Sequence, residues 1–431
     1  MRDVSLWRAV LGVEKTVIED IEFDEQSQIV VAHVRPRRAG RGRCGVCGVR
    51  AARYDNGEGR RRWRSLDMGT TMVFLEADSP RVSCPEHGPT VRQVPWARHA
   101  AGHTYRFDQQ VAWLATQCSK SAVTQLMRIA WRTVGAIITR VWADTAAGID
   151  PLAGLRRIGI DEISYKRNYK YLTIVVDHDT GRLVWVGIGR DKATVRAFFQ
   201  ALGPERCAQI THVTADGAKW IGDVVGEACP AAVRCTDPFH VVKWATDALD
   251  EVRRNVWNAA RGDRQQLRAR RMANKVNRAR GHAQQVKHAR YALWKNPENL
   301  TTRQAAKLAW IAKCEPTLHR AYLLKEGLRL VFRLPIDEAE TALEAWISWA
   351  RRCRIERFVH LQRTICTYRT EILASIEHGL SNGLIESVNT KIRLITRMAF
   401  GFRSPEALIA LAMLNLGGHR PALPGRQNTH G

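Results

Sequence analysis

The chain has 431 residues, which is enough for about three domains at roughly 150 residues per domain. Hydrophobic residues make up 45% and charged residues 25% of it, close to the averages of soluble globular proteins, so the composition excludes a disordered or fibrous protein. Lys and Arg number 67 against 42 Asp and Glu, and the resulting formal net charge of +25 favours a polyanionic partner, with nucleic acid as the first candidate.

The sequence carries no signal for export or membrane insertion. No apolar run approaches the ~20 residues that cross a bilayer, and the first ten residues mix charged with apolar side chains. Ten cysteines are too few for a disulfide scaffold in a chain of this length, and the spacing of some of them is that of metal ligands. We therefore expect a cytoplasmic protein with no membrane partner.

The first 98 residues are expected to form a strand-rich, zinc-binding domain. Two residues separate Cys44 from Cys47, and two separate Cys84 from His87, which supplies the four ligands of a closed, structural Cys3His zinc site. The 36 residues between the pairs exceed the usual ribbon spacing, so this segment has to fold back as a hairpin. Two unrelated cysteine pairs are the alternative, but Gly and Pro stand where a metal knuckle turns. Strands are predicted at 17–23, 28–34 and 71–77.

A helix-turn-helix is predicted next. Apolar residues recur with a helical period, and one helix at 121–127 is separated by a short break from a second at 133–141. In that arrangement the second helix enters the major groove, with Arg132, Thr133 and Arg140 as exposed candidates for base or phosphate contact. An ordinary helical hairpin would produce the same apolar stripe.

The following region alternates strand and helix signals and predicts a mixed α/β sheet. Three strands joined by short polar turns are expected to form an antiparallel meander. Two helices then alternate with two further strands, which places those strands parallel to the first. The expected strands are 158–165, 171–177, 183–189, 210–214 and 232–235, and the expected helices are 194–202 and 220–228.

After His240 the pattern is helical for more than a hundred residues. Between Glu251 and Lys307 there are fifteen Lys and Arg but three acids, so this stretch holds about half of the net charge of the chain. A solvated helix face is the ordinary explanation of a charge run. We expect DNA contact instead, because charge this one-sided repels itself unless a polyanion is present.

Two aspartates are placed to converge at one edge of the predicted sheet. Asp161 lies in the first strand among apolar neighbours, and a buried carboxylate requires a metal or a partner. Asp216 follows the fourth strand, which is expected to run parallel beside the first. Two such carboxylates suit a pair of Mg²⁺ ions about 3.5 to 4 Å apart that act on a phosphodiester.

A third acid, Glu386, is predicted near the start of a helix after a Ser-Asn-Gly turn. Asn389 and Arg393 lie three and seven residues later and so share its face. A carboxylate, an amide and a guanidinium on one stripe suit a metal together with a DNA phosphate. Each acid also has an ordinary explanation: Asp161 as a strand-end residue, Asp216 as a turn former, and Glu386 as a first-turn residue favoured by the helix dipole.

In combination these features resemble the ISL3 family of bacterial insertion-sequence transposases. The zinc ligands, the helix-turn-helix and the acids occur in the order of that family, so the resemblance covers nearly the whole chain. The matching residues are Asp161, Asp216, Asn382-Gly383, Glu386, Lys391, Arg397 and Gly401-Phe402-Arg403.

The resemblance implies a ribonuclease H-like catalytic domain with a DDE triad of Asp161, Asp216 and Glu386, interrupted by a helical insertion. Its cofactors would be two Mg²⁺ or Mn²⁺ ions in addition to the structural zinc. Glu162 is a rival to Asp161, because adjacent strand residues face opposite sides of a sheet. Asp237 and His240 look like the Cys/Asp-x-x-His signature of related DDE transposases, and an Asp-Pro turn before a helix is the alternative explanation of that pair.

The implied function is a transposase that binds the terminal inverted repeats of its own element and cuts and joins DNA. Double-stranded DNA would be its partner, a homodimer or larger assembly would form in the synaptic complex, and the protein would be nucleoid-associated. A domesticated DNA-binding regulator without chemistry and a nuclease of the same fold are the alternatives. The expected domains are 1–98, 99–150, 151–245, 246–370 as the insertion, 371–415 with the third acid, and 416–431 as a tail.

Overall fold

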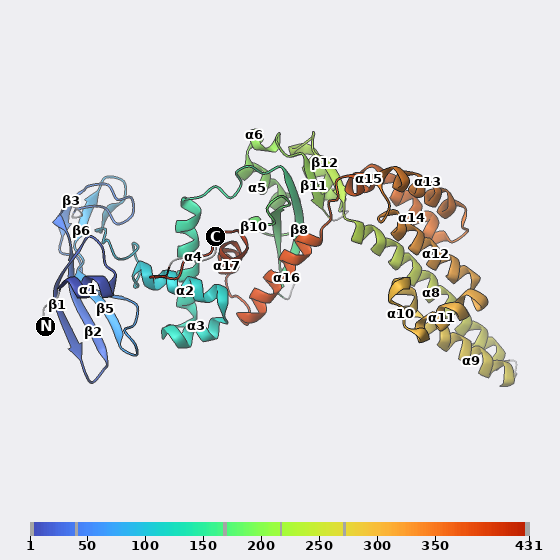
Figure 1. The fold of residues 1–431 in the computed structure, drawn as a ribbon, viewed down its shortest axis with the longest axis horizontal. Helices are drawn as coiled ribbons and strands as arrows, with labels where there is room; N and C mark the ends of the chain where they lie inside the picture. Colours follow the sequence, from blue (N-terminus) through green and yellow to red (C-terminus); the bar gives the residue numbers. More distant parts are fainter. Residues whose placement is uncertain (1–3, 39–41, 167–169, 216–217, 270–272, 427–431) are drawn as a thin grey trace. The chain divides into compact units, whose positions relative to one another are not determined.

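The computed structural model describes residues 4–38, 42–166, 170–215, 218–269 and 273–426 of the chain. Two compact units are present (Figure 1): Met1–Pro151 with Leu394–Gly431 form the first, and Leu152–Arg393 form the second. The sequence predicted that residues 371–415 would complete the catalytic domain. The boundary between the two units falls at Leu394, within this segment, and the assignment of the whole segment to the catalytic domain stays a prediction.

Two small sheets form the beginning of the first unit. The four-stranded sheet has the order β1-β2-β5-β4, and the three-stranded sheet has the order β3-β6-β7. In β5, alternate residues Val73, Leu75 and Ala77 are buried, as expected for a strand with one face on a core. The elements are α1 (Val4–Leu11), β1 (Thr16–Asp24), β2 (Ile29–Pro36), β3 (Ala52–Asp55), β4 (Arg60–Arg64), β5 (Met72–Asp78), β6 (Arg81–Cys84) and β7 (Gly88–Val91).

Four helices complete the first unit: α2 (Tyr105–Gln117), α3 (Lys120–Met127), α4 (Trp131–Ala147) and α17 (Pro405–Leu416). Arg128 takes a left-handed conformation and ends α3. The break between the two helices covers residues 128–130, so α4 begins two residues before the predicted start at residue 133. The apolar stripe predicted for the second helix is buried in α4. The apolar helix α17 packs against α4 and α2, which explains why the C-terminal segment belongs to this unit.

A five-stranded mixed sheet forms the centre of the second unit, with the order β10-β9-β8-β11-β12. The predicted antiparallel meander is confirmed, and β11 and β12 run parallel to β8 as predicted. Its elements are β8 (Arg157–Lys166), β9 (Lys170–Asp177), β10 (Leu183–Ile188), α5 (Lys192–Leu202), α6 (Pro204–Cys207), β11 (His212–Ala215), α7 (Lys219–Ala228) and β12 (Val233–Thr236).

Helices cover both faces of β8. Ile158 and Ile160 share a core with residues of α5 and α7 on one face. On the opposite face Gly159 meets Ile385 of α16 (Gly383–Met398), and a Cβ added at Gly159 would lie 2.4 Å from Cδ1 of Ile385. Only a residue without a side chain therefore allows α16 to approach β8 this closely (Figure 1).

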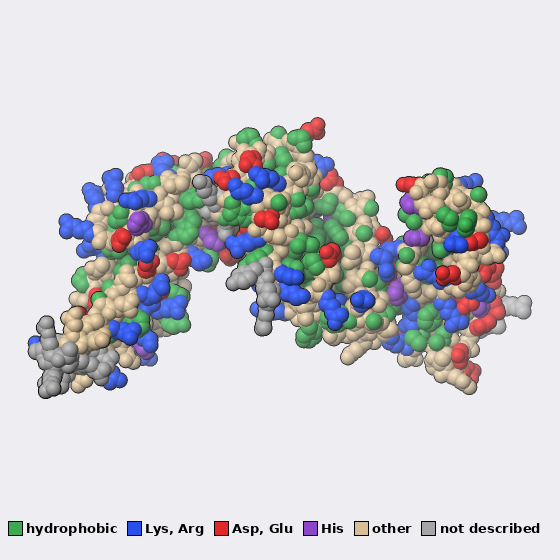
Figure 2. Space-filling view, turned by 180° about the vertical axis from the view of Figure 1, so that it is seen from behind, with side chains coloured by type: hydrophobic (Ala, Val, Ile, Leu, Met, Phe, Trp, Pro, Cys, Tyr) green, Lys and Arg blue, Asp and Glu red, His purple; other side chains and the backbone are tan. Residues whose placement is uncertain are grey.

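A helical bundle with its own hydrophobic core follows β12 and precedes α16. On the face seen in Figure 2, Lys and Arg side chains outnumber acidic ones over this bundle. Among the described residues no helix is both long and apolar enough to span a membrane. The helices are α8 (Pro238–Ala269), α9 (Ala273–Lys287), α10 (Arg290–Trp294), the 3-10 turn η2 (Pro297–Asn299), α11 (Thr302–Cys314), α12 (Pro316–Val331), α13 (Ile336–Arg352), α14 (Glu356–Thr367) and α15 (Arg369–Glu377).

The close approach of α16 to β8 can be tested with Gly159→Ala. The added methyl group would overlap the fully buried Ile385, so we expect a loss of about 1–3 kcal/mol of unfolding free energy, measured by urea denaturation. Gly226→Ala in α7 is the control, because nothing lies within 4 Å of its added Cβ. Ile385→Val should recover part of the loss in the Gly159→Ala background. A Gly159→Ala protein as stable as the parent would show that the contact is not tight.

Candidate functional site

Asp161 lies in β8 on the face covered by α16. Its Oδ2 accepts a hydrogen bond from Nδ2 of Asn389 at 2.7 Å, and its Oδ1 accepts one from the backbone N–H of Glu162, also at 2.7 Å. The side chain of Glu162 is 5% exposed and pairs with Nε of Arg190 at 3.1 Å. Asp161 therefore contacts α16 through Asn389, while Glu162 forms an ion pair with Arg190.

Helix α16 carries the third predicted acid next to this contact. Glu386 lies three residues before Asn389, which is close to one helical turn. The backbone N–H of Glu386 donates to the carbonyl oxygen of Asn382 at 2.8 Å, so this acid lies in the first turn. Glu386 and Arg393 are exposed, whereas Asn389 is buried against β8. The helix thus presents an exposed carboxylate beside the buried amide that contacts Asp161.

The second predicted acid, Asp216, lies outside the described residues. The described part of β11 ends at Ala215, whose partner in β8 is Ile160. Ile160 is the residue immediately before Asp161. The described strands therefore establish the parallel register between β8 and β11, and the position of Asp216 itself stays a prediction.

Asp237, at the end of β12, connects the start of α8 to the start of α16. Its Oδ2 lies 2.8 Å from Nδ1 of His240, and its Oδ1 accepts a hydrogen bond from the backbone N–H of Asn382 at 3.1 Å. Burial raises the pKa of Asp237, but the hydrogen bonds from His240 and Asn382 outweigh it, so the pKa lies below its usual value. This carboxylate is thus ionised and fixes the turn from which α16 begins.

The oxygen atoms around Asp161 suit a divalent cation. The amide nitrogen of Asn389 donates to Asp161. The amide oxygen, Oδ1, is buried and has no hydrogen-bond partner among the described residues. A buried acceptor without a donor is costly unless a ligand satisfies it. Carboxylate and amide oxygens are the ligands preferred by Mg²⁺ and Mn²⁺, so these residues fit such an ion.

Sequence reasoning missed His178, which lies near Gly159 of β8. Its Nε2 is 2.7 Å from the hydroxyl oxygen of Thr214 in β11, and a Cβ at Gly159 would come within 2.9 Å of it. Burial and the nearby Arg157 charge lower its pKa, so the imidazole is neutral at pH 7. A single histidine in a strand-connecting turn gave no signal for this position.

The four predicted zinc ligands converge, and their ligand atoms all lie within 4.8 Å of one another. Sγ of Cys84 lies 3.6 Å from Sγ of Cys47 and 3.6 Å from Nδ1 of His87, close to the separation of about 3.5 to 3.8 Å that tetrahedral zinc imposes. The backbone N–H of Val46 points at Sγ of Cys44 at 3.4 Å, and Gly48 closes the knuckle with a φ of +70°. The site is built for one structural ion.

The helix-turn-helix presents only part of the predicted DNA-contacting set. Arg132 is exposed in the first turn of α4, and Thr133 beside it is half-buried. Arg140, however, is half-buried and directs its guanidinium at Asp108 of α2, with both nitrogen to oxygen distances at 3.3 Å. The expectation that Arg140 is exposed was therefore wrong, because a buried carboxylate in α2 requires its charge.

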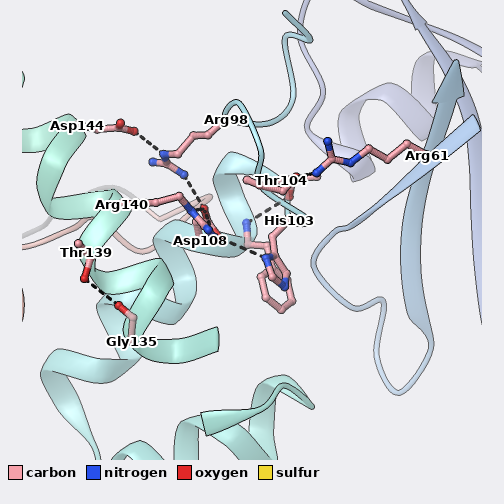
Figure 3. A network of polar contacts seen from close by, with 11 residues as sticks. Arg61, Arg98, His103, Thr104, Asp108, Gly135, Thr139, Arg140 and Asp144 are labelled. Atoms are coloured by element: carbon pink, nitrogen blue, oxygen red, sulfur yellow. Dashed lines mark hydrogen bonds and ion pairs between the residues drawn. The ribbon is translucent and has the colours of Figure 1, made fainter. Parts of the chain in front are cut away.

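Asp108 is the centre of a buried polar network that joins α2 and α4 to the segment before them (Figure 3). Its side chain is fully buried and pairs with Arg98 at 2.9 Å as well as with Arg140, and Arg98 also contacts Asp144. Burial raises the pKa of Asp108 in spite of these two cations. Burial and the charges of Arg140 and Arg64 lower the pKa of the adjoining His103 to about 4, which keeps it neutral.

Comparison with known proteins gives matches along nearly the whole chain. Residues 158–412 match a family model described as transposase, residues 92–142 match the helix-turn-helix domain of transposase family ISL3, and residues 40–87 match the zinc-finger of transposases IS204/IS1001/IS1096/IS1165. The chain is 64% identical over 438 residues to the transposase for insertion sequence element IS1557 of Mycobacterium tuberculosis, with 99% of both chains covered. It is 26% identical over 409 residues to the transposase for insertion sequence element IS1001 of Bordetella parapertussis, covering 94% and 96% of the two chains.

The zinc centre can be tested by metal analysis. The protein should contain one zinc per chain, and Cys44→Ser should lose it and destabilise the first sheets by several kcal/mol, because binding of a structural zinc contributes directly to folding. Elemental analysis and thermal melting measure both effects. Cys314→Ser is the control, since that exposed thiol lies in the helical bundle. A Cys44→Ser protein that retains its zinc would contradict the ligand assignment.

The Asp108 network predicts a large effect of a small change. Asp108→Asn removes the anion between Arg98 and Arg140 and should cost about 3–5 kcal/mol in thermal or urea unfolding, because two cations would remain without their buried partner. Asp144→Asn changes an acid that is half-exposed and contacts the same arginine, and it should cost less than about 1 kcal/mol. Equal effects of the two substitutions would exclude a central role for Asp108.

Proposed function

Because this chain belongs to the ISL3 family of insertion-sequence transposases, we propose that it binds the terminal inverted repeats of its own element and cuts and joins DNA. The conclusion rests on the family matches and on the site that β8 and α16 form together. The observation that carries it is the hydrogen bond from Asn389 to Asp161, since it places the helix of the third acid against the strand of the first.

We propose Asp161, Asp216 and Glu386 as the catalytic triad and a ribonuclease H-like fold for the sheet that holds two of them. Three antiparallel strands followed by two strands parallel to the first support that fold. Asp161 contacts α16 through Asn389, and Glu386 lies about one turn away on the same helix. Asp216 follows the strand beside β8, and this sequence position supports it as the second acid.

Two Mg²⁺ or Mn²⁺ ions are the proposed catalytic cofactors, to be held by the three acids. When bound, such ions supply an activated attacking oxygen and offset charge on the leaving oxygen. The residues of the chain perform the positioning: Asn389 holds the Asp161 carboxylate in one orientation, and the Asp237 to Asn382 hydrogen bond fixes the start of α16. Exposed Arg393 is proposed to hold a DNA phosphate beside the acids, and His240 is proposed as an active-site neighbour.

DNA recognition is assigned to the first unit. Arg132 and Thr133 at the start of α4 are proposed to contact DNA, and the zinc ion is proposed to stabilise the adjoining sheets. Arg140 is proposed to orient α4 through Asp108 instead of touching DNA. The basic bundle would follow the phosphate backbone, so that binding weakens with salt. Joining two element ends requires two such recognition surfaces, which favours at least a dimer in the synaptic complex.

The triad is tested by DNA cleavage in the presence of Mg²⁺. Asp161→Asn, Asp216→Asn and Glu386→Gln should each reduce cleavage of a duplex that carries the element ends by about a thousandfold or more, because each removes charge that holds the catalytic ions. Binding of the same duplex should survive. Asp223→Asn is the control. This surface acid lies in α7, which packs on the face of the sheet opposite to α16, and it pairs with Lys192.

Three outcomes would change the conclusion. Cleavage by Asp216→Asn at the parent rate would exclude that residue from the triad. Cleavage by the parent without strand transfer would indicate a nuclease. Specific binding of the ends by the parent without cleavage, under any divalent cation, would indicate a regulator that has lost the chemistry.

A further inference from the structure

A pocket of the first unit lies between the first half of α4 and the turn that precedes α17. Its lining includes Lys120, Trp131, Arg132, Gly135, Phe402 and Arg403. The first four belong to the helix-turn-helix, while the last two come from the far end of the chain. The family matches assign no role to this combination, which we name the α4–α17 pocket.

Lys120 is a buried cation that lines this pocket. Its residue is 8% exposed, and its ammonium lies 4.6 Å from the ring centre of Trp131 and 5.6 Å from that of Phe402. It lies over Gly135, where an added Cβ would be 3.5 Å from Nζ. Among the described residues no carboxylate or hydrogen-bond acceptor is paired with this ammonium. The two rings offset only part of its lost hydration.

The surroundings of Lys120 add positive charge and no negative charge. Arg132 and Arg403 line the same pocket and are exposed, and no Asp or Glu is among the described residues that line it. Glu406 is near in sequence, but its carboxylate accepts a hydrogen bond from the hydroxyl of Ser404 at 2.6 Å. Burial and the charge of Arg403 lower the pKa of Lys120. The cations therefore repel one another until an anion enters.

The start of α4 favours an anion at the same place. Its N-cap residue, Ala130, has no side-chain acceptor, and its first turn contains no acid. Trp131 and Arg132 of this first turn line the pocket, so the positive end of the helix dipole lies at the pocket and has no capping side chain. Unlike the Asp108 network, in which a carboxylate of the chain neutralises the arginines, this cluster has a place for an external anion.

We propose that the α4–α17 pocket binds one phosphodiester group of the DNA backbone, held by Lys120, Arg132 and Arg403. The inference deepens the proposed function and rests on it. A phosphodiester carries one negative charge and two free oxygens, and lysine and helix N-termini are common partners of phosphate. Because a backbone contact fixes the register of a recognition helix, Phe402 and Arg403 would belong to the machinery of end binding.

The first experiment measures DNA binding by the full-length protein with Lys120→Gln and Arg403→Gln. Each should weaken binding about tenfold on both the element end and a scrambled duplex, because a phosphate contact carries no sequence information. Each should also lower the slope of log affinity against log salt by about 0.9. Arg196→Gln is the matched control, since it removes one positive charge from α5, where Arg196 pairs with Glu227. It should change neither quantity.

The second experiment locates the phosphate. Neutral methylphosphonate linkages are placed one at a time through the element end. One linkage should weaken binding by the parent about tenfold but have no further effect on Lys120→Gln. The melting temperature of Lys120→Gln should be equal to or above that of the parent, because the substitution removes an unpaired buried charge. A purely structural lysine would lower it.

Two results would overturn the pocket without affecting the proposed function. One is a folded Lys120→Gln and Arg403→Gln pair that binds DNA with the affinity and salt slope of the parent. The other is Lys120-dependent binding of inorganic phosphate, seen as a change in Trp131 fluorescence against Trp131→Phe, with no linkage in the DNA that depends on Lys120. Failure of the parent itself to bind the element end would instead count against the proposed function.

Discussion

The candidate active site depends on how closely α16 lies on β8. Ile385 occupies the space above Gly159, and Asn389, one turn later, bonds to Asp161, two residues further along the strand. Four helical residues rise about 6 Å and two strand residues about 6.6 Å, so the two contacts match only in this register. A shift of one residue would turn Asn389 away from the carboxylate and carry Glu386 with it.

Two groups of cations in the first unit illustrate how a structural charge differs from one that awaits a ligand. Arg98 and Arg140 surround the fully buried Asp108, and their charges are neutralised within the fold. Lys120 is also buried, yet two aromatic rings lie near its ammonium, and the described residues that line its pocket include two arginines and no carboxylate. The sequence alone does not distinguish the two groups, since each is a set of basic residues in or near amphipathic helices.

Much of this architecture could be predicted from the sequence because local patterns determine it. The alternation of strand residues and the polar turns predict the mixed sheet, and the paired spacing of Cys44 and His87 with their partners predicts the zinc centre. What could not be predicted depends on contacts between distant segments. The sequence around Arg140 does not indicate that this residue pairs with the buried Asp108, and no local pattern indicates that α17 packs on α4. Gly159 looks like any strand glycine until Ile385 lies against it.

The proposed catalytic site is tested most directly by mapping which parts of the chain surround one bound metal ion. With Fe²⁺ in place of Mg²⁺, ascorbate and peroxide generate hydroxyl radicals that cut the backbone near the ion, and mass spectrometry identifies the fragments. We expect cuts beside Asp161, Asp216 and Glu386 together, and the loss of all three in Asp161→Asn. Cuts confined to one of these segments, or cuts beside Glu386 that persist without Asp161, would contradict the proposed site.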